Sequence, residues 1–190
     1  MACGTGKTLT ALRLAEELVP GGTVLFLAPS ISLVAQSMRD WAEQVRGRLN
    51  PYVVCSDPKA SSLGKGDPAE VAESYGTLSM VPYPATTNSG LLASRFRADP
   101  GALNVVFSTY QSIDVIHEAQ EAGLPSFDLV ICDEAHRTTG RMHGEDGKAD
   151  ETAFVRVHDN AWIDARRRLY MTATPRVYQT KDDEKLAGMA

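Results

Sequence analysis

The chain reads Gly4-Thr5-Gly6-Lys7-Thr8 close to its start, directly ahead of an apolar pattern of helical period. Two glycines allow the backbone to curl so that successive N–H groups point at phosphate oxygens. The lysine supplies a positive charge for the β- and γ-phosphates, and the threonine after it offers a hydroxyl to Mg²⁺. The amino end of the helix would direct its dipole at the same anion. These five residues therefore predict a phosphate-binding loop for a nucleotide.

The motif has one departure from the general pattern, and the residues allow one alternative. Met1 stands six positions before Lys7, where the general pattern has glycine. A glycine-containing turn ahead of an ordinary helix would also fit this stretch. A phosphate-binding loop normally follows a β-strand, and the motif lies at the very start of the sequence. We therefore expect a sheet that lacks the strand before the loop.

Composition indicates a single globular domain, since 190 residues are enough for one sizeable core. There are 19 basic and 24 acidic residues, a net charge of −5, so any contact with nucleic acid would be a local surface. Three cysteines without paired spacing indicate packed thiols in a reducing compartment rather than a disulfide framework. No signal peptide is visible, nor any apolar run near the ~20 residues of a membrane span. We expect a cytoplasmic protein.

Apolar runs of strand length alternate with stretches of helical period along the chain. This alternation predicts an α/β domain with a mostly parallel sheet and helices on both faces. Two polar stretches, 56–90 and 138–150, are predicted to be mainly loop. The predicted strands are 23–28, 52–55, 104–108, 127–132 and 169–173, and the predicted helices are 11–18, 31–45, 91–97 and 111–122.

Two adjacent carboxylates, Asp133 and Glu134, follow the fourth predicted strand directly. Open α/β sheets bind ligands at the carboxyl ends of their strands, and paired carboxylates there are costly unless they meet a cation. Asp133 would hold Mg²⁺, Glu134 would orient and deprotonate an attacking water, and His136 could pass the state of the γ-phosphate to neighbouring elements. Asp and Glu also suit a helix N-cap. Their occurrence together with the phosphate-binding loop favours a site for nucleotide hydrolysis.

The fifth predicted strand ends in Thr172-Ala173-Thr174. Two hydroxyls on either side of a small residue can bridge the carboxylates to another surface. Threonine is common in strands, so this stretch is a weak signal by itself.

Taken in order, these stretches resemble the first motor domain of a superfamily 2 helicase or translocase. Two longer stretches, 133–140 and 171–178, are similar to the motors of bacterial restriction enzymes, which are type III restriction subunit-like helicases. Among these, the resemblance is closest to single-polypeptide ATP-dependent restriction-modification proteins, whose motor lies between a nuclease and a methyltransferase. Residues 2–8 resemble motif I, 29–36 motif Ia, 108–112 motif Ib, 133–136 the DEAH form of motif II, and 172–174 motif III.

The resemblance implies a RecA-like P-loop NTPase fold over residues 1–178, with 179–190 beginning a linker to a second RecA-like domain. In such motors the two domains sandwich ATP, and the second supplies arginine fingers. The implied cofactors are ATP and Mg²⁺, and a chain without the second domain is expected to have weak or no activity. By resemblance, Gly4, Thr5, Gly6, Lys7 and Thr8 bind the nucleotide, Thr8 and Asp133 hold Mg²⁺, and Lys7, Glu134, His136, Thr172 and Thr174 serve catalysis and its coupling to movement.

The resemblance also implies a path for one nucleic-acid strand, formed by the residues that follow two of the strands. Contacts to phosphates carry no sequence information, as a tracking motor requires. Ser30 would equally suit the N-cap of the next helix, and Tyr110 is the best candidate for stacking on a base. The implied contact residues are Pro29, Ser30, Ser108, Thr109 and Tyr110.

Three functions remain open at this point. The first is the ATP-binding half of a motor that moves on duplex DNA, with nuclease and methyltransferase modules as partners. The second is a truncated nucleotide- or DNA-binding fragment without activity. The third is the first motor domain of an RNA helicase, because motifs I to III do not separate RNA from DNA.

Overall fold

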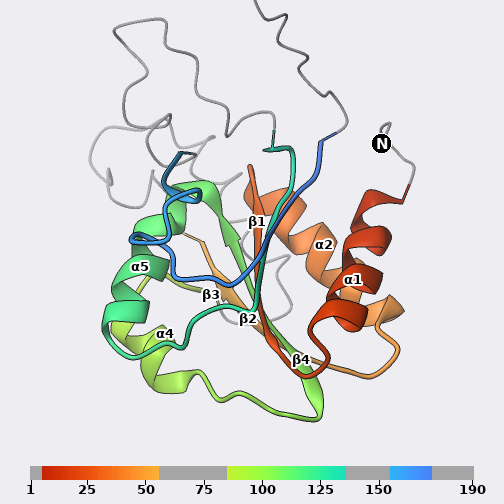
Figure 1. The fold of residues 1–190 in the computed structure, drawn as a ribbon, viewed down its shortest axis with the longest axis horizontal. Coiled ribbons are helices and arrows are strands. Elements are labelled where there is room, and N and C mark those ends of the chain that lie inside the picture. Colours follow the sequence, from red (N-terminus) through yellow and green to blue (C-terminus); the bar gives the residue numbers. More distant parts are fainter. Residues whose placement is uncertain (1–5, 56–84, 136–154, 173–190) are drawn as a thin grey trace, which may run out of the picture.

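The structure is a computed structural model that describes residues 6–55, 85–135 and 155–172 (Figure 1). A six-stranded sheet with the order β3-β2-β4-β1-β5-β6 forms its centre, and every pairing between neighbouring strands is parallel. The strands are β1 (Thr23–Ala28), β2 (Arg48–Val54), β3 (Ala85–Thr86), β4 (Ala102–Thr109), β5 (Leu129–Cys132) and β6 (Arg168–Tyr170).

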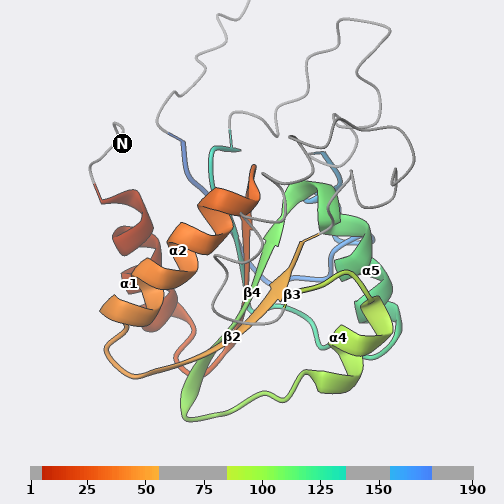
Figure 2. The ribbon, with the colours of Figure 1, turned by 180° about the vertical axis from the view of Figure 1, so that it is seen from behind.

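Helices cover both faces of this sheet. The first two helices pack on one face, and α4 and α5 pack on the other, as the two views show (Figures 1 and 2). A 3₁₀ turn, η2, leads into α5. The helices and the turn are α1 (Lys7–Leu18), α2 (Ile31–Gln44), α4 (Ser89–Arg95), η2 (Tyr110–Ser112) and α5 (Ile113–Glu121). The predicted α/β class, the parallel sheet and the two helical layers are confirmed.

All five predicted strands are present, and β3 was missed. This strand has only two residues and lies in a polar stretch, so no apolar run marks it. The prediction of loop is therefore wrong for 85–86 and for the first residues of α4, while 56–84 and 138–150 lie outside the described residues. Helix α4 begins at Ser89, two residues early, because the Asn88 side chain accepts a hydrogen bond from the Leu91 N–H at 2.7 Å.

Strands β1 and β4 are buried along their whole length because helices cover both of their faces. Alternate side chains enter the two halves of the core. On the face of α1 and α2, Phe26 of β1 lies between its register partners Phe107 and Ile131. On the face of α4 and α5, Leu25 and Leu27 pack with residues of those helices.

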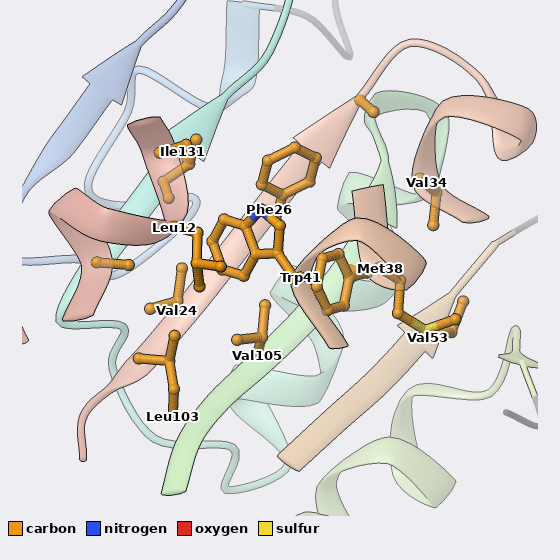
Figure 3. Close-up of a cluster of buried hydrophobic side chains, with 14 of the residues drawn as sticks. Leu12, Val24, Phe26, Val34, Met38, Trp41, Val53, Leu103, Val105 and Ile131 are labelled. Carbon is orange, nitrogen blue, oxygen red and sulfur yellow. The ribbon is translucent and has the colours of Figure 1, made fainter. Parts of the chain in front are cut away.

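Trp41 of α2 is the largest side chain of the first half of the core (Figure 3). Its ring centroid lies 5.4 Å from that of Phe26 and 5.6 Å from that of Phe107, both in edge-to-face geometry. Its indole Nε1 donates a hydrogen bond to the Thr8 carbonyl in the first turn of α1, at 3.1 Å. Trp41 therefore holds α1, α2 and the sheet together.

The face of α1 differs from the predicted one. Ala11 and Ala15 are buried as expected, but Leu18 is exposed and Leu12 is buried in its place. Over the described part of the chain, no helix combines the length and the apolar composition that crossing a membrane requires.

We predict that Trp41→Ala lowers the free energy of unfolding by about 3–5 kcal/mol, because it empties a fully buried site and removes a hydrogen bond. Trp162→Ala is the matched control, since Trp162 is only partly buried and should cost clearly less. Urea denaturation followed by circular dichroism measures both. Equal losses in the two variants would contradict the central role of Trp41.

Candidate active site

The candidate site lies at the edge of the sheet where the parallel strands end. The predicted motifs follow the last residues of β1, β4, β5 and β6, and the amino end of α1 lies at the same edge (Figure 1). Parallel strands bring their carboxyl ends together, which explains why residues far apart in the sequence meet here.

The structure brings Lys7 and Glu134 into direct contact. The Lys7 Nζ lies 2.8 Å from Glu134 Oε1, and the two side chains are only 12% and 24% exposed. A largely buried ammonium needs an anionic partner, and the carboxylate supplies one. The ion pair joins the first turn of α1 to the residues after β5, as the pairing of the two predicted motifs requires.

Gly6 is followed directly by α1 and has a φ of 74°, in the left-handed region. Among the described residues, no heavy atom would lie within 4 Å of a Cβ added there. Gly6 is the N-cap of α1 and has no side chain to bond the helix N–H groups. The amino end of a helix with a lysine beside it suits a phosphate group.

The turn after β5 is strained at Glu134, whose φ is 50°. No other described residue except glycine has a positive φ, and this conformation costs about 1–2 kcal/mol. Hydrogen bonds on both sides maintain it. The Asp133 N–H donates to the Leu27 carbonyl at 2.9 Å, and the Ala135 N–H donates to the Met171 carbonyl at 2.8 Å. Such strain is typical of functional sites.

Asp133 is a buried carboxylate, with 8% of its surface exposed. Burial raises its pKa above the ordinary value of 3.8, and the nearby Glu134 carboxylate adds to the rise. The hydrogen bond from the Glu134 N–H to Asp133 Oδ1, at 3.0 Å, and the charge of Lys7 oppose the shift without cancelling it. A cation would stabilise the charged form of this group.

The donor set fits Mg²⁺ better than a cation that needs a full protein cage. The described residues contain no group of three or more histidine, cysteine, aspartate or glutamate side chains placed to hold a metal. Mg²⁺ keeps several waters and commonly takes one or two carboxylates together with phosphate oxygens. Asp133 and the hydroxyl of Thr8, in the first turn of α1, could supply the protein ligands.

The remaining predicted nucleotide and coupling residues are only partly described. Thr172 follows β6, where the Met171 N–H donates to the Cys132 carbonyl at 2.9 Å, so it lies beside the turn of Asp133 and Glu134. The other four predicted residues lie outside the described part of the chain: Gly4, Thr5, His136 and Thr174.

The residues predicted to contact nucleic acid divide into two groups. Pro29 and Ser30 lie at the surface after β1, and the Ser30 hydroxyl accepts from the Leu33 N–H at 3.3 Å, so it is also the N-cap of α2. Ser108, Thr109 and Tyr110 are buried. These three side chains do not face solvent in this structure, and their contact with nucleic acid stays a prediction.

The buried hydroxyls have partners within the fold. Ser108 Oγ donates to the Thr109 carbonyl at 3.1 Å, and Thr109 Oγ1 and Ser112 Oγ are 2.9 Å apart. The Tyr110 ring packs in the core and cannot stack on a base, and its hydroxyl donates to the Asp133 carbonyl at 2.8 Å. Sequence reasoning missed this contact with motif II, and no spacing in the sequence indicates it.

The sequence matches the protein family described as Type III restriction enzyme, res subunit, over residues 1–177. Among curated proteins, the probable helicase A859L of African swine fever virus is 30% identical over 194 residues; the alignment covers the whole chain and 18% of the viral protein. The same protein from another isolate is 29% identical, with the same coverage. The chain thus spans less than a fifth of these relatives.

Among solved structures, a nuclease-deletion mutant of the Type ISP restriction-modification enzyme LlaGI, in complex with a DNA substrate mimic, is 39% identical with a TM-score of 0.69. The ATP-dependent Type ISP enzyme LlaBIII bound to DNA is 37% identical with a TM-score of 0.68. Both matches cover 94% of this chain, but only 13% and 11% of the respective enzymes.

The helicase domain of Hef from Pyrococcus furiosus shares the fold, with a TM-score of 0.51 at 22% identity. This match covers 95% of this chain and 29% of the Hef chain. The RecA-like fold is therefore confirmed from a more distant protein as well. With its α/β architecture and its match over nearly the whole length, the chain belongs to the Type III restriction enzyme res subunit family, as a superfamily 2 helicase motor domain that resembles the motors of Type ISP restriction-modification enzymes.

Proposed function

We propose that this chain is the ATP-binding half of an ATP-dependent DNA translocase of a restriction-modification enzyme. Hydrolysis of ATP to ADP and phosphate would drive movement along duplex DNA. The single observation that carries the proposal is the contact of 2.8 Å between Lys7 and Glu134, because it unites a phosphate-binding lysine with a candidate general base. The similarity to two DNA-bound Type ISP enzymes supports DNA as the track.

Lys7 would exchange its partner when nucleotide binds. In this structure its ammonium is neutralised by Glu134, and the β- and γ-phosphates of ATP would offer a stronger anion beside Gly6. This exchange would release the Glu134 carboxylate. The same contact therefore keeps the base occupied before the substrate arrives.

Glu134 would then orient a water molecule and accept its proton as the water oxygen bonds to the γ-phosphorus. The bond between this phosphorus and the β,γ-bridging oxygen breaks, and ADP leaves with the electron pair. Bound Mg²⁺ would neutralise charge that develops on the phosphate oxygens. Thr8 and Asp133 would hold the ion, and the left-handed conformation of Glu134 would set the direction of its carboxylate.

Coupling to movement would need more than these residues. We propose that residues 1–178 form the first motor domain and that 179–190 lead toward a second RecA-like domain. Arginine fingers of the kind expected there are worth about 10³–10⁵ in rate, so this chain alone should hydrolyse ATP slowly. His136, Thr172 and Thr174 would relay the state of the nucleotide, while Pro29 and Ser30 would contact the DNA backbone.

In the full-length protein that carries this domain, Lys7→Ala should abolish both nucleotide binding and hydrolysis. Glu134→Gln should keep binding but lower the turnover by at least about 100-fold, because the amide cannot accept the proton. Binding of a fluorescent ATP analogue and release of phosphate measure the two effects. Glu17→Gln, an exposed change on α1, is the matched control and should retain both. Near-normal turnover of Glu134→Gln would refute the assigned base.

Asp133→Asn should stabilise the metal-free protein at neutral pH while it abolishes hydrolysis. A raised pKa means that the folded state holds the Asp133 proton more tightly than the unfolded chain does. Ionised Asp133 therefore lowers stability at any pH above the ordinary range of aspartate, and asparagine removes this cost but keeps an oxygen for the Glu134 N–H.

Thermal unfolding in EDTA between pH 4 and 8 tests this expectation. The midpoint of Asp133→Asn should exceed that of the wild type at pH 7.5, and the gap should close toward pH 4, where Asp133 gains its proton. Asp164→Asn, an exposed change away from the site, is the matched control. A lower midpoint for Asp133→Asn at neutral pH would contradict the electrostatic account.

The choice between DNA and RNA has a direct test. Duplex DNA should stimulate the ATPase of the full-length protein several-fold, and duplex RNA of the same length should not. Because the contacts are to phosphates, stimulation should be independent of sequence away from any recognition site and should fall as salt rises. Stimulation by RNA alone would favour the RNA helicase instead.

A further inference from the structure

We infer that Tyr110 is a positioning residue for Glu134, and that its buried hydroxyl fixes the strained peptide which directs the Glu134 carboxylate. This inference rests on the proposed ATPase function for its consequence in catalysis. Its structural basis is the hydrogen bond of 2.8 Å from Tyr110 Oη to the Asp133 carbonyl.

The hydrogen bond joins two elements that are not neighbours in the sheet. Tyr110 follows β4 and Asp133 follows β5, and β1 lies between these strands. Neighbouring strands lie about 4.8 Å apart, so the tyrosine side chain and its hydrogen bond together span roughly two strand spacings. It does so inside the core that α5 covers, with no exposed surface of its own.

The carbonyl that accepts the Tyr110 hydrogen bond belongs to the peptide unit that joins Asp133 to Glu134. The N–H of this same unit is that of Glu134, and it donates to Asp133 Oδ1 at 3.0 Å. The φ angle of Glu134, which is 50°, is measured relative to the plane of this peptide. A hydrogen bond that fixes the plane therefore helps to fix the direction of the Glu134 side chain. Tyr110 therefore acts on the direction of both carboxylates through one contact.

The tyrosine is well suited to be a constant donor. Burial raises the pKa of its hydroxyl, and the adjacent Cys132 and Asp133 raise it further, so the group stays protonated. The side chains of Thr109 and Ser112 close the turn around it with a contact of 2.9 Å.

Loss of this hydroxyl would leave a buried carbonyl without its donor and would let Glu134 leave the left-handed region. Gly6 and the first turn of α1 would keep their positions, and Lys7 would exchange Glu134 for the phosphates on nucleotide binding in either case. The expected defect is therefore in turnover rather than in nucleotide affinity, which is a pattern that a general loss of stability does not produce.

The test compares Tyr110→Phe with Tyr52→Phe in the full-length protein. Tyr52 is the matched control because its hydroxyl also bonds main chain, accepting from the Arg97 N–H at 2.9 Å, away from the site. We expect Tyr110→Phe to lower kcat for ATP about tenfold with KM within about twofold of the wild type, and Tyr52→Phe to change neither. A kcat of Tyr110→Phe within twofold of the wild type would overturn the catalytic part.

A stability cycle tests the structural part without any activity measurement. Glycine adopts the left-handed region freely and alanine does not. Loss of the Tyr110 hydrogen bond lets a strained alanine relax, whereas glycine has no strain to release. Tyr110→Phe should therefore lower the melting temperature more in a Glu134→Gly background than in a Glu134→Ala background, while the effect of Tyr52→Phe should be equal in both. Equal effects of Tyr110→Phe in the two backgrounds would overturn the inference.

The two readouts separate the inference from the proposed function. If Lys7→Ala left hydrolysis intact, the proposed function would fail, yet the cycle would still decide whether Tyr110 holds Glu134. If Lys7→Ala abolished hydrolysis and Tyr110→Phe behaved like Tyr52→Phe, the function would stand and the role of Tyr110 would fall.

Discussion

Parallel pairing of every described strand is the constraint on which the rest of the structure depends. A parallel sheet is buried on both faces, so α1 and α2 must cover one side and α4 and α5 the other. It also gathers the ends of all strands at one edge. Lys7 and Glu134, which are 127 residues apart in the sequence, therefore meet at 2.8 Å.

Much of the fold follows from local sequence patterns, and the exceptions have physical causes. Fully apolar runs mark β1 and β4 because both faces of these strands are covered. The two-residue β3 has no such run and depends on its neighbour β2 for its existence. The face of α1 was misjudged at Leu18, since helical period alone does not say which of two apolar stripes meets the sheet.

The candidate site shows a similar division. The motifs predict that a lysine after Gly6 and a glutamate after β5 should meet, and they do. The burial of Tyr110 could not be predicted, because a residue directly after a strand can turn either to solvent or back under the sheet. Nor does the sequence around Glu134 indicate a left-handed backbone, which depends on hydrogen bonds that the turn donates to carbonyls of β1 and of Met171 after β6. Buried charge and backbone strain are thus concentrated in one turn and balanced by a rigid core.

The hydrogen bond from the Trp41 indole to the Thr8 carbonyl has a practical consequence. The emission of an indole responds to the bonding of its N–H group, and this one is attached to the first turn of the helix that would face the phosphates. The sequence has two tryptophans, and replacement of Trp162 would leave a single optical reporter beside the first turn of α1. Its emission would then offer a label-free signal for occupancy of the proposed nucleotide site.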